Sequence, residues 1–258
     1  MPTPYWGSYR PGSSDPYKIS RSKVELFNNC PRCFWLDRRK KVGRVQGPPF
    51  QINKAVDELL KNEFDSYRQK GQPHPWMEEY NIDAIPFEHK DLDRWRHNFT
   101  GVQRLHEPTN LLLYGAIDDV WQAPDETLIV ADYKATAKKS EVSLDADWQI
   151  VYKRQMEFYQ WLLRGNGFDV SDTAWFVYSN GIPDNPDFKN KVEFRTKLIA
   201  YEGDDSWIEP TLKKIKDTLD SDELPDRTPD CEWCDYVEHR VGNAVKMAKT
   251  KKDQTTLL

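Results

Sequence analysis

Two Cys-x-x-Cys motifs near opposite ends of the sequence constrain the fold more than any other feature. "CPRC" supplies Cys30 and Cys33, "CEWC" supplies Cys231 and Cys234, and no other cysteine occurs in the 258 residues. In a reducing compartment, paired spacing of this kind indicates metal ligation before it indicates disulfide bonds. Four thiolates can close a tetrahedral zinc site or hold an iron–sulfur cluster. Either group would clamp the two ends of the chain together beside the segment between them.

The composition indicates a globular protein with a packed core. Hydrophobic residues make up 38% of the chain and aromatic residues 13%, which is too apolar for a disordered chain. We find no apolar run long enough to cross a membrane and no signal peptide, so we expect no membrane association and a cytoplasmic location, in a host cell if the source is viral. A net charge of -5 argues against a protein that coats DNA without specificity, but it is compatible with an acidic metal site.

The hydrophobic pattern predicts a single α/β domain with a mixed central β-sheet flanked by helices. We expect a flexible lead-in over 1–18, the domain itself over 19–243 with a proline-rich insertion at 71–110, and a basic tail over 244–258. Helices are expected from Ser20 to the first cysteine pair and over 50–67, 92–105, 147–163 and 206–221. Strands are expected as an antiparallel pair within 110–136, and over 173–181 and 192–200.

An acidic strand pair is the candidate for chemistry. In "IVADYKAT", period-two alternation places Asp132 and Lys134 on one face and Tyr133 on the other, while "YGAIDDVW" supplies Asp118 and Asp119 on opposite faces. If the strands pair, one of these two carboxylates meets Asp132. Neighbouring carboxylates repel unless a proton or a cation lies between them, and Mg²⁺ or Mn²⁺ suits oxygen ligands. The alternative is an ordinary surface salt bridge at a strand end.

Three short motifs follow one another in an order that resembles a known family. "GAID" spans 115–118, "DYK" spans 132–134, and "QMEFY" spans 155–159 at the start of a predicted helix. This order resembles the GxxD, (D/E)xK and QxxxY signatures of the PD-(D/E)XK nuclease superfamily, specifically its RecB-type branch. The resemblance covers roughly residues 20–240 and leaves 71–110 outside it. It implies a restriction-endonuclease-like core.

The resemblance also implies a role for each motif residue. It assigns Mg²⁺ or Mn²⁺ to Asp118, Asp132 and the carbonyl of Tyr133, and it assigns the nucleophilic water to Lys134. Gln155 and Tyr159 would support the site or contact DNA, and they lie one helical turn apart. The alternative for this last pair is a Gln and a Tyr on an ordinary packed helix.

One position departs from the family pattern. The upstream helix of the family usually presents a histidine followed four residues later by an acid, and "FQINKAVDELL" places Asn53 and Asp57 at these positions. An asparagine can ligate through its carbonyl oxygen or accept a hydrogen bond from a metal-bound water, but more weakly than an imidazole. A solvated polar helix face is the alternative for both residues.

The cysteines carry a second resemblance. "CPRCFWL" and "CEWCDY" resemble segments of the CRISPR-associated iron–sulfur exonucleases and of the AddB-type helicase-nucleases, which implies a [4Fe-4S] cluster. The last family ligand would fall near Arg240, where no cysteine occurs, and Cys33 is the candidate to replace it. Zinc remains the alternative, because two Cys-x-x-Cys pairs are also the spacing of a zinc ribbon.

A basic cluster follows the first cysteine pair. Arg38, Arg39 and Lys40 could hold a DNA backbone, or could form a solvated helix end. Together these features lead us to expect a Mg²⁺- or Mn²⁺-dependent deoxyribonuclease, an exonuclease on single-stranded DNA, that hydrolyses phosphodiester bonds in DNA repair, recombination, phage replication or CRISPR adaptation. It would have possible protein partners in such a complex. The alternative is a catalytically weak or inactive DNA-binding or adaptor module of the same fold.

Overall fold

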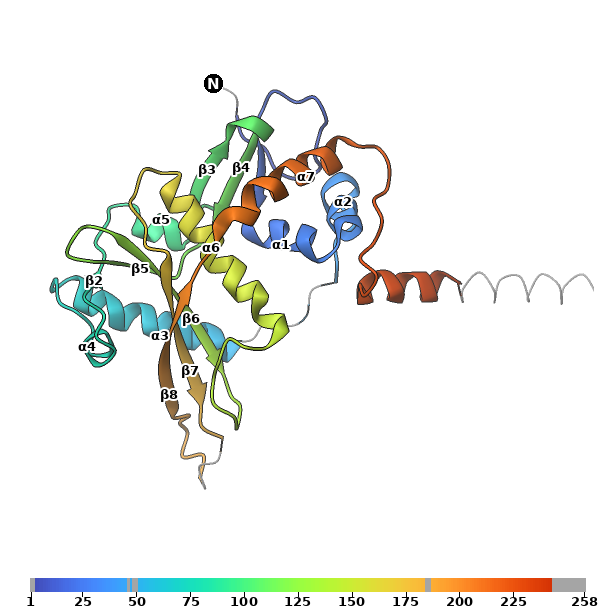
Figure 1. Ribbon diagram of the computed structural model, residues 1–258. Coiled ribbons are helices and arrows are strands. Elements are labelled where there is room, and N and C mark those ends of the chain that lie inside the picture. The colour runs from blue at the N-terminus through green and yellow to red at the C-terminus, as the bar shows by residue number, and fades with distance from the viewer. Residues whose placement is uncertain (1–2, 46, 48–50, 184–186, 243–258) are drawn as a thin grey trace, which may run out of the picture.

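The chain forms two mixed β-sheets with helices packed around them (Figure 1). The computed structural model describes residues 3–45, 47, 51–183 and 187–242. In the five-stranded sheet the order is β2 (Ile85–Pro86), β5 (Asp119–Gln122), β6 (Leu128–Thr136), β7 (Thr173–Gly181) and β8 (Phe194–Glu202). In the three-stranded sheet the order is β1 (Tyr17–Ser20), β4 (Leu111–Gly115) and β3 (Val102–His106). The predicted α/β class with mixed strands is confirmed, with the strands divided between two sheets.

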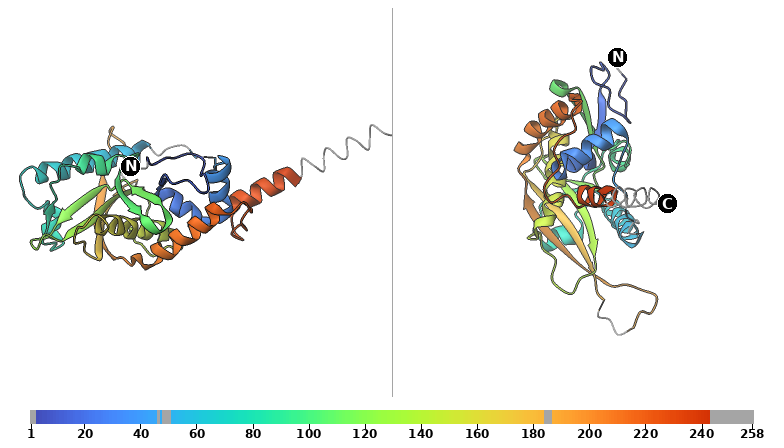
Figure 2. Two further views of the ribbon diagram at one scale, coloured as in Figure 1. Left: turned by 90° about the horizontal axis from the view of Figure 1, so that it is seen from above. Right: turned by 90° about the vertical axis from the view of Figure 1, so that its right-hand side faces the viewer.

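Helices cover opposite faces of the five-stranded sheet. α3 (Gln51–Arg68) lies on one face and α6 (Ile150–Arg164) on the other, as the view from above shows (Figure 2). α7 (Ile208–Asp220) packs mainly against α1 (Arg21–Asn29) and α2 (Pro31–Lys40), on the side of α6. The three predicted helices at these places are therefore confirmed. The remaining helical segments are α4 (Pro75–Glu79), α5 (Leu92–Arg96), the 3-10 turns η1 (Glu107–Thr109), η2 (Asp147–Gln149) and η3 (Asp205–Trp207), and a helix over 232–242.

The strand pair that carries the acidic motifs is an antiparallel hairpin. Asp119 pairs with Ala131 and Gln122 with Leu128, so β5 and β6 turn through 123–127. β6 then pairs in parallel with β7, where Asp132 faces Phe176 across the strands. The predicted strands at 173–181 and 192–200 correspond to β7 and β8. The apolar run "LLLYG", expected in the same pair as β6, forms β4 in the other sheet instead.

The helix expected from Ser20 to the first cysteine pair is confirmed as α1, but two other parts of the helix prediction need correction. α2 was not predicted; it starts directly after α1 because Cys30 has an extended backbone and Pro31 stands at its first position. The helix expected over 92–105 is a single turn, α5. The chain leaves that helix at His97 and continues as strand β3.

The segments expected at the edges of the domain make defined contacts. The 71–110 segment, predicted to be an insertion, contributes β2 to one sheet and β3 to the other. In the predicted lead-in, Tyr9 is buried and donates its hydroxyl to Asp220 at 2.7 Å, and Gly7 accepts a hydrogen bond from Tyr17. The predicted basic tail, 244–258, lies outside the described residues. Within the part that is described, no helix is both long and apolar enough to cross a membrane.

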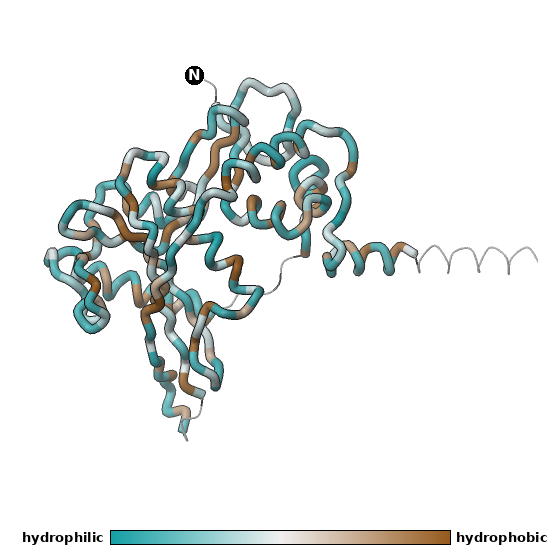
Figure 3. The backbone as a smooth tube through the Cα atoms, in the orientation of Figure 1, coloured by the Kyte–Doolittle hydropathy of each residue, from teal (hydrophilic) through white to brown (hydrophobic). Residues whose placement is uncertain are grey.

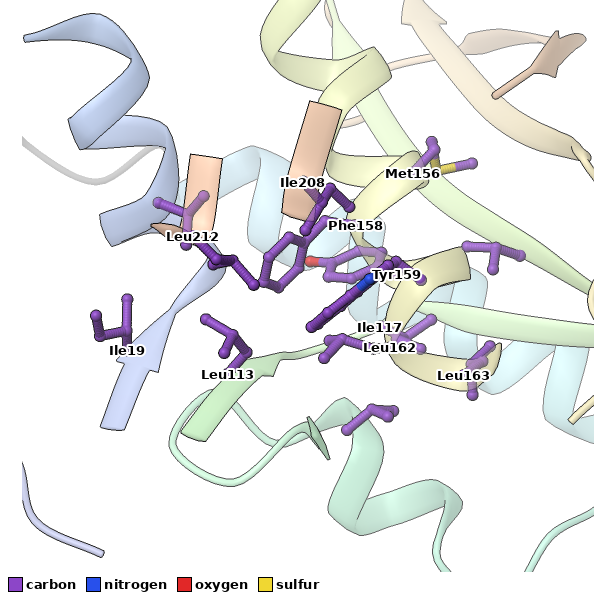
Figure 4. Packing of buried hydrophobic residues seen from close by; sticks show 14 of the residues in the cluster. Ile19, Leu113, Ile117, Met156, Phe158, Tyr159, Leu162, Leu163, Ile208 and Leu212 are labelled. Atoms are coloured by element: carbon purple, nitrogen blue, oxygen red, sulfur yellow. The ribbon is translucent and has the colours of Figure 1, made fainter. Parts of the chain in front are cut away.

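Two buried clusters lie on the two faces of the five-stranded sheet. The larger joins α6, α7 and the three-stranded sheet, and Figure 4 shows Phe158 and Tyr159 pointing toward Leu113, Ile208 and Leu212. The smaller cluster lies under α3 and includes Phe64, Trp121, Tyr133 and Val177. Hydrophobic residues accordingly follow the central strands, and hydrophilic residues follow the outer turns of the helices (Figure 3). A fully buried side chain of this size contributes about 1.5–3 kcal/mol, so both clusters fix β6 between two packed layers.

Candidate functional site

Asp132 lies at the centre of the site, on β6. The residue is 0% exposed, and its side chain points toward α6, on the face that also carries Lys134. Its Oδ1 accepts a hydrogen bond of 2.8 Å from Nε2 of Gln155. Its buried Oδ2 forms an ion pair with Lys134. Burial is the main cause that raises the pKa of Asp132 to about 7; Lys134 opposes this rise and the neighbouring Asp118 carboxylate adds to it.

Asp118 is the carboxylate that meets Asp132. It stands in the loop between β4 and β5, and its Oδ2 accepts a 3.1 Å hydrogen bond from the backbone N–H of Tyr133. Its side chain is 23% exposed, whereas Asp132 is closed off from solvent. Carboxylate oxygens from two residues therefore lie at the same end of the sheet: those of Asp132 are buried, and those of Asp118 are accessible to solvent.

Asp119 points the opposite way and belongs to a buried ionic network. It is 0% exposed, pairs with Arg68 and with Arg96 at 3.1 Å, and accepts a 2.7 Å hydrogen bond from the hydroxyl of Tyr133. Arg96 also donates from Nε to the backbone carbonyl of Asp118 at 3.0 Å. The network behind the sheet thus fixes the loop that carries the exposed carboxylate.

Gln155 and Tyr159 connect α6 to both acidic motifs. Nε2 of Gln155 donates to Asp132 and, at 3.0 Å, to the hydroxyl of Tyr159, while its Oε1 lies 3.4 Å from Nζ of Lys134. Tyr159 is buried, and its ring packs against the end of β4. A Cβ at Gly115 would lie 2.6 Å from Cε1 of Tyr159, so only glycine allows this close approach. Gly115 of the "GAID" motif therefore leaves the space that Tyr159 of the "QMEFY" motif fills.

α3 brings three polar side chains to the same end of the sheet. Asn53 is exposed and donates from Nδ2 to the carbonyl of Ala135 at 3.1 Å, which places it one residue beyond Lys134. Asp57 lies one turn further along, and burial together with Asp118 raises its pKa. Nζ of Lys61 lies 2.7 Å from Oδ2 of Asp57 and 3.8 Å from Oδ1 of Asp118.

A polar cleft of about 480 Å³ opens beside these groups. Four basic residues line it together with Asp118: Arg21, Lys54, Lys61 and Arg96. The sequence interpretation missed all four. The signal that could have identified Lys61 is its spacing of four residues from Asp57, whereas Arg21 and Arg96 come from distant segments. Lys61 and Arg96 pair with carboxylates of the protein, so Arg21 and Lys54 are the basic residues of the cleft that suit a phosphodiester, whose charge they would neutralise.

The basic residues predicted to hold DNA lie elsewhere. Arg38, Arg39 and Lys40 end α2, and none of them is among the described residues that line the cleft. Arg38 pairs with Asp37, and Arg39 donates to the carbonyl of Leu219 at 2.7 Å. The exposed Lys40 lies over the ring of Trp35. Two of the three side chains therefore bind within the protein.

The four cysteines form one cluster that joins the two ends of the described chain. All four are free and buried, and their Sγ atoms lie within 4.8 Å of one another. The closest approaches are 3.6 Å between Cys33 and Cys231, 3.7 Å between Cys33 and Cys234, and 3.8 Å between Cys30 and Cys234. Four convergent thiolates of this kind could bind a metal. The cluster lies at the start of α2 and of the 232–242 helix, as predicted for a clamp between distant segments.

Two neighbouring carboxylates and a lysine at one end of a sheet, beside a polar cleft lined by basic and acidic side chains, form a site of the kind found in proteins that act on phosphodiester bonds. Residues 18–238 match the family model of the PD-(D/E)XK nuclease superfamily, and the chain belongs to this superfamily. Its members are generally nucleases that bind nucleic acid and usually use divalent metal ions. The three motifs and the match thus agree on the family.

The other comparisons add the following. No curated protein matches the sequence at a significant level. Among solved structures, the chain is similar to the crystal structure of SSO0001, with a TM-score of 0.38 and 14% identity over 83% of this chain and 80% of that chain.

Proposed function

We propose that the protein is a Mg²⁺- or Mn²⁺-dependent deoxyribonuclease of the RecB-like kind that hydrolyses phosphodiester bonds. The observation that carries this proposal is the buried Asp132 beside Asp118, with Lys134 on the same strand face. The sequence resemblance adds finer parts to this proposal. The substrate would be single-stranded DNA, cleavage would start from an end, and the role would lie in repair, recombination, phage replication or CRISPR adaptation.

The donor set fits a hard divalent cation. Oδ2 of Asp132 is buried and faces the ammonium of Lys134, and Oδ1 of Asp118 faces the ammonium of Lys61, so each oxygen already lies next to a positive charge. These two oxygens, with the carbonyl of Tyr133, would hold the ion, because Mg²⁺ and Mn²⁺ prefer carboxylate and carbonyl ligands. When bound, such an ion supplies charge that acidifies a bound water and neutralises the phosphate.

The side chains around the carboxylates have separate tasks in this proposal. Lys134 would orient the attacking water and stabilise the charge that develops on the phosphate, since its ammonium is held between Asp132 and Gln155. Gln155 and Tyr159 are positioning residues that keep Asp132 in one orientation. Arg21 and Lys54 would bind the phosphates that flank the cleaved bond.

A catalytically weak or inactive DNA-binding module of the same fold is the second candidate. It is favoured by Asn53, whose amide donates to a backbone carbonyl where the family usually has a histidine. This candidate predicts binding of DNA, or of a protein partner in a larger complex, without turnover.

The test of the proposed activity is cleavage of labelled single-stranded and double-stranded DNA with Mg²⁺ or Mn²⁺. We expect the wild type to cut, and we expect Asp132→Ala and Lys134→Met to lose at least about 100-fold in rate, the scale of a lost charge-stabilising group. Asp125→Ala, which removes an exposed acid from the loop between β5 and β6, is the matched control and should cut normally. DNA binding by the wild type without any cleavage would favour the second candidate.

For the cysteine cluster we propose a single zinc ion with a structural role. A tetrahedral ion with metal–sulfur bonds of about 2.3 Å separates its sulfur atoms by about 3.8 Å, and three of the observed separations are 3.6–3.8 Å. A [4Fe-4S] cluster binds each thiolate through a different iron and so spreads the sulfur atoms further apart. The spacing supports zinc over the iron–sulfur cluster that the sequence resemblance implies.

Metal analysis of the purified protein distinguishes the two groups. We expect one zinc per chain, no acid-labile sulfide, and a colourless solution after anaerobic purification. A brown protein with four iron atoms per chain would refute the zinc proposal. The DNA cleavage assay is read separately from this result, because none of the four cysteines lines the polar cleft beside the carboxylates.

A further inference from the structure

Lys61 occupies a place between two carboxylates of the acidic site. Its ammonium lies 2.7 Å from Asp57 on the same helix and 3.8 Å from Asp118 in the loop after β4. The lysine side chain is 17% exposed, Asp57 is 26% exposed and Asp118 is 23% exposed. In an ordinary ion pair on an exposed helix surface, the lysine contacts only the acid one turn away. Lys61 also contacts Asp118, which lies in a separate segment of the chain.

We infer that Lys61 is a built-in cation that takes the place of a second divalent ion, so that the site binds one metal ion only. The inference rests on the proposed metal site at Asp118 and Asp132. It assigns Asp57 and Asp118 as the carboxylates that a second ion would need and that Lys61 already neutralises. Asn53 fits this assignment, because the neutral amide there binds a backbone carbonyl and gives a second ion no strong ligand.

The charges of the site support a single ion. Three carboxylates (Asp57, Asp118 and Asp132) contribute three negative charges, and the two ammonium groups that contact them, on Lys61 and Lys134, contribute two positive charges. These five groups sum to one negative charge, and one divalent ion changes the sum to one positive charge, which attracts a phosphate. The other charged residues that line the cleft (Arg21, Lys54, Arg96 and Glu58) add a net two positive charges. A second ion would bring the five groups alone to three positive charges in a partly buried site, where like charges repel strongly.

The hydrogen bonds of Asp118 lead to the same conclusion. Its Oδ2 already accepts the N–H of Tyr133, so Oδ1 is the oxygen left for a metal ion. If one ion uses Oδ1 together with Asp132, a second ion would have to displace Lys61 from the remaining space next to Asp57. Removing the lysine should open that space while both carboxylates of the first ion, Asp118 and Asp132, stay in place.

The test counts bound Mn²⁺ by electron paramagnetic resonance, with the cysteine site filled with zinc beforehand because thiolates prefer softer metals. We expect one Mn²⁺ for the wild type and two for Lys61→Met. Lys61→Arg, which keeps the charge, should bind one. The double variant Lys61→Met/Asp57→Asn should return to one, because the second ion loses a ligand.

Lys54→Met is the matched control. Lys54 lines the same cleft from the same helix and forms no ion pair with Asp57 or Asp118 in the part of the chain that the structure describes. The Lys54→Met variant should bind one Mn²⁺, as the wild type does. Circular dichroism checks that each variant is folded, and Lys61→Gln serves as a second neutral variant where the methionine unfolds the chain.

The outcomes separate this inference from the proposed function. Two Mn²⁺ ions in the wild type, or one in both neutral variants of Lys61, would overturn the inference and leave the metal-dependent nuclease intact. No Mn²⁺ in the wild type would overturn the proposed metal site and the inference with it. A count that rises from one to two only when the charge at Lys61 is removed would support both.

Discussion

Asp132→Asn should stabilise the protein when Mg²⁺ and Mn²⁺ are absent, although it should abolish cleavage. Asp132 is fully buried, and burial together with Asp118 raises its pKa to about 7 from an ordinary value of 3.8, against the opposing pull of Lys134. The ionised carboxylate therefore costs the folded state free energy at neutral pH. A neutral amide of the same shape does not carry this cost.

The magnitude follows from the two pKa values. They differ by about 3, and each pKa unit corresponds to about 1.4 kcal/mol, so the ionised Asp132 opposes folding by up to about 4 kcal/mol at pH 8. Because the folded state keeps the proton to a higher pH than the unfolded state does, this cost is absent below about pH 4. It grows as the pH rises from about 4 to about 7 and is constant above that range.

Urea denaturation of the wild type and Asp132→Asn at several pH values measures this effect. We expect the free energy of unfolding of the variant to exceed that of the wild type by about 2–4 kcal/mol at pH 8, and the difference to vanish near pH 4. Asp226→Asn, at an exposed loop position, is the control and should stay within about 0.5 kcal/mol of the wild type. A difference that does not change with pH would refute the reasoning, because it would mean that Asp132 is not protonated more readily in the folded state.

Three further changes have defined outcomes. Gly115→Ala puts a methyl group 2.6 Å from Cε1 of Tyr159, so urea denaturation should show a loss of about 1–3 kcal/mol; an unchanged midpoint would mean that the ring moves aside freely. Tyr133→Phe removes a hydrogen bond from the buried Asp119 and should cost about 1–3 kcal/mol in the same assay, with the arginine partners preventing a larger loss. Cys231→Ser should lower the bound zinc measured by mass spectrometry and the melting temperature together; a full zinc content would remove this thiolate from the ligand set.

The sequence predicted the local elements well where one periodic pattern dominated. The spacing of Val56, Leu60 and Phe64 predicted α3, and these three side chains are buried, whereas Ile52 and Leu59 from the same pattern are exposed. The order of the motifs also located Asp132, Lys134 and Gln155, because their side-chain directions follow from strand and helix periodicity alone. These residues required no knowledge of distant partners.

The parts that could not be predicted depend on contacts between distant segments. Alternation showed that Asp118 and Asp119 face opposite ways, but only Arg68 and Arg96, far away in the sequence, decide which of them is buried. In the same way, the run that forms β4 is apolar enough for either sheet, and its pairing with β1 is non-local. The basic cluster shows the same limit, since the sequence alone could not show that Arg39 binds the end of α7.

The structure also explains why the three motifs are informative only as a set. Gly115 leaves the space into which the ring of Tyr159 packs, Tyr159 accepts a hydrogen bond from Gln155, and Gln155 holds Asp132. Each motif therefore fixes a side chain of the next, and the loss of any contact would release the buried carboxylate. A lone D-x-K strand end has no such constraint, because its acid and lysine can pair in solvent at little cost. The short sequence "DYK" acquires a specific geometry only because residues 115 and 155–159 enclose it.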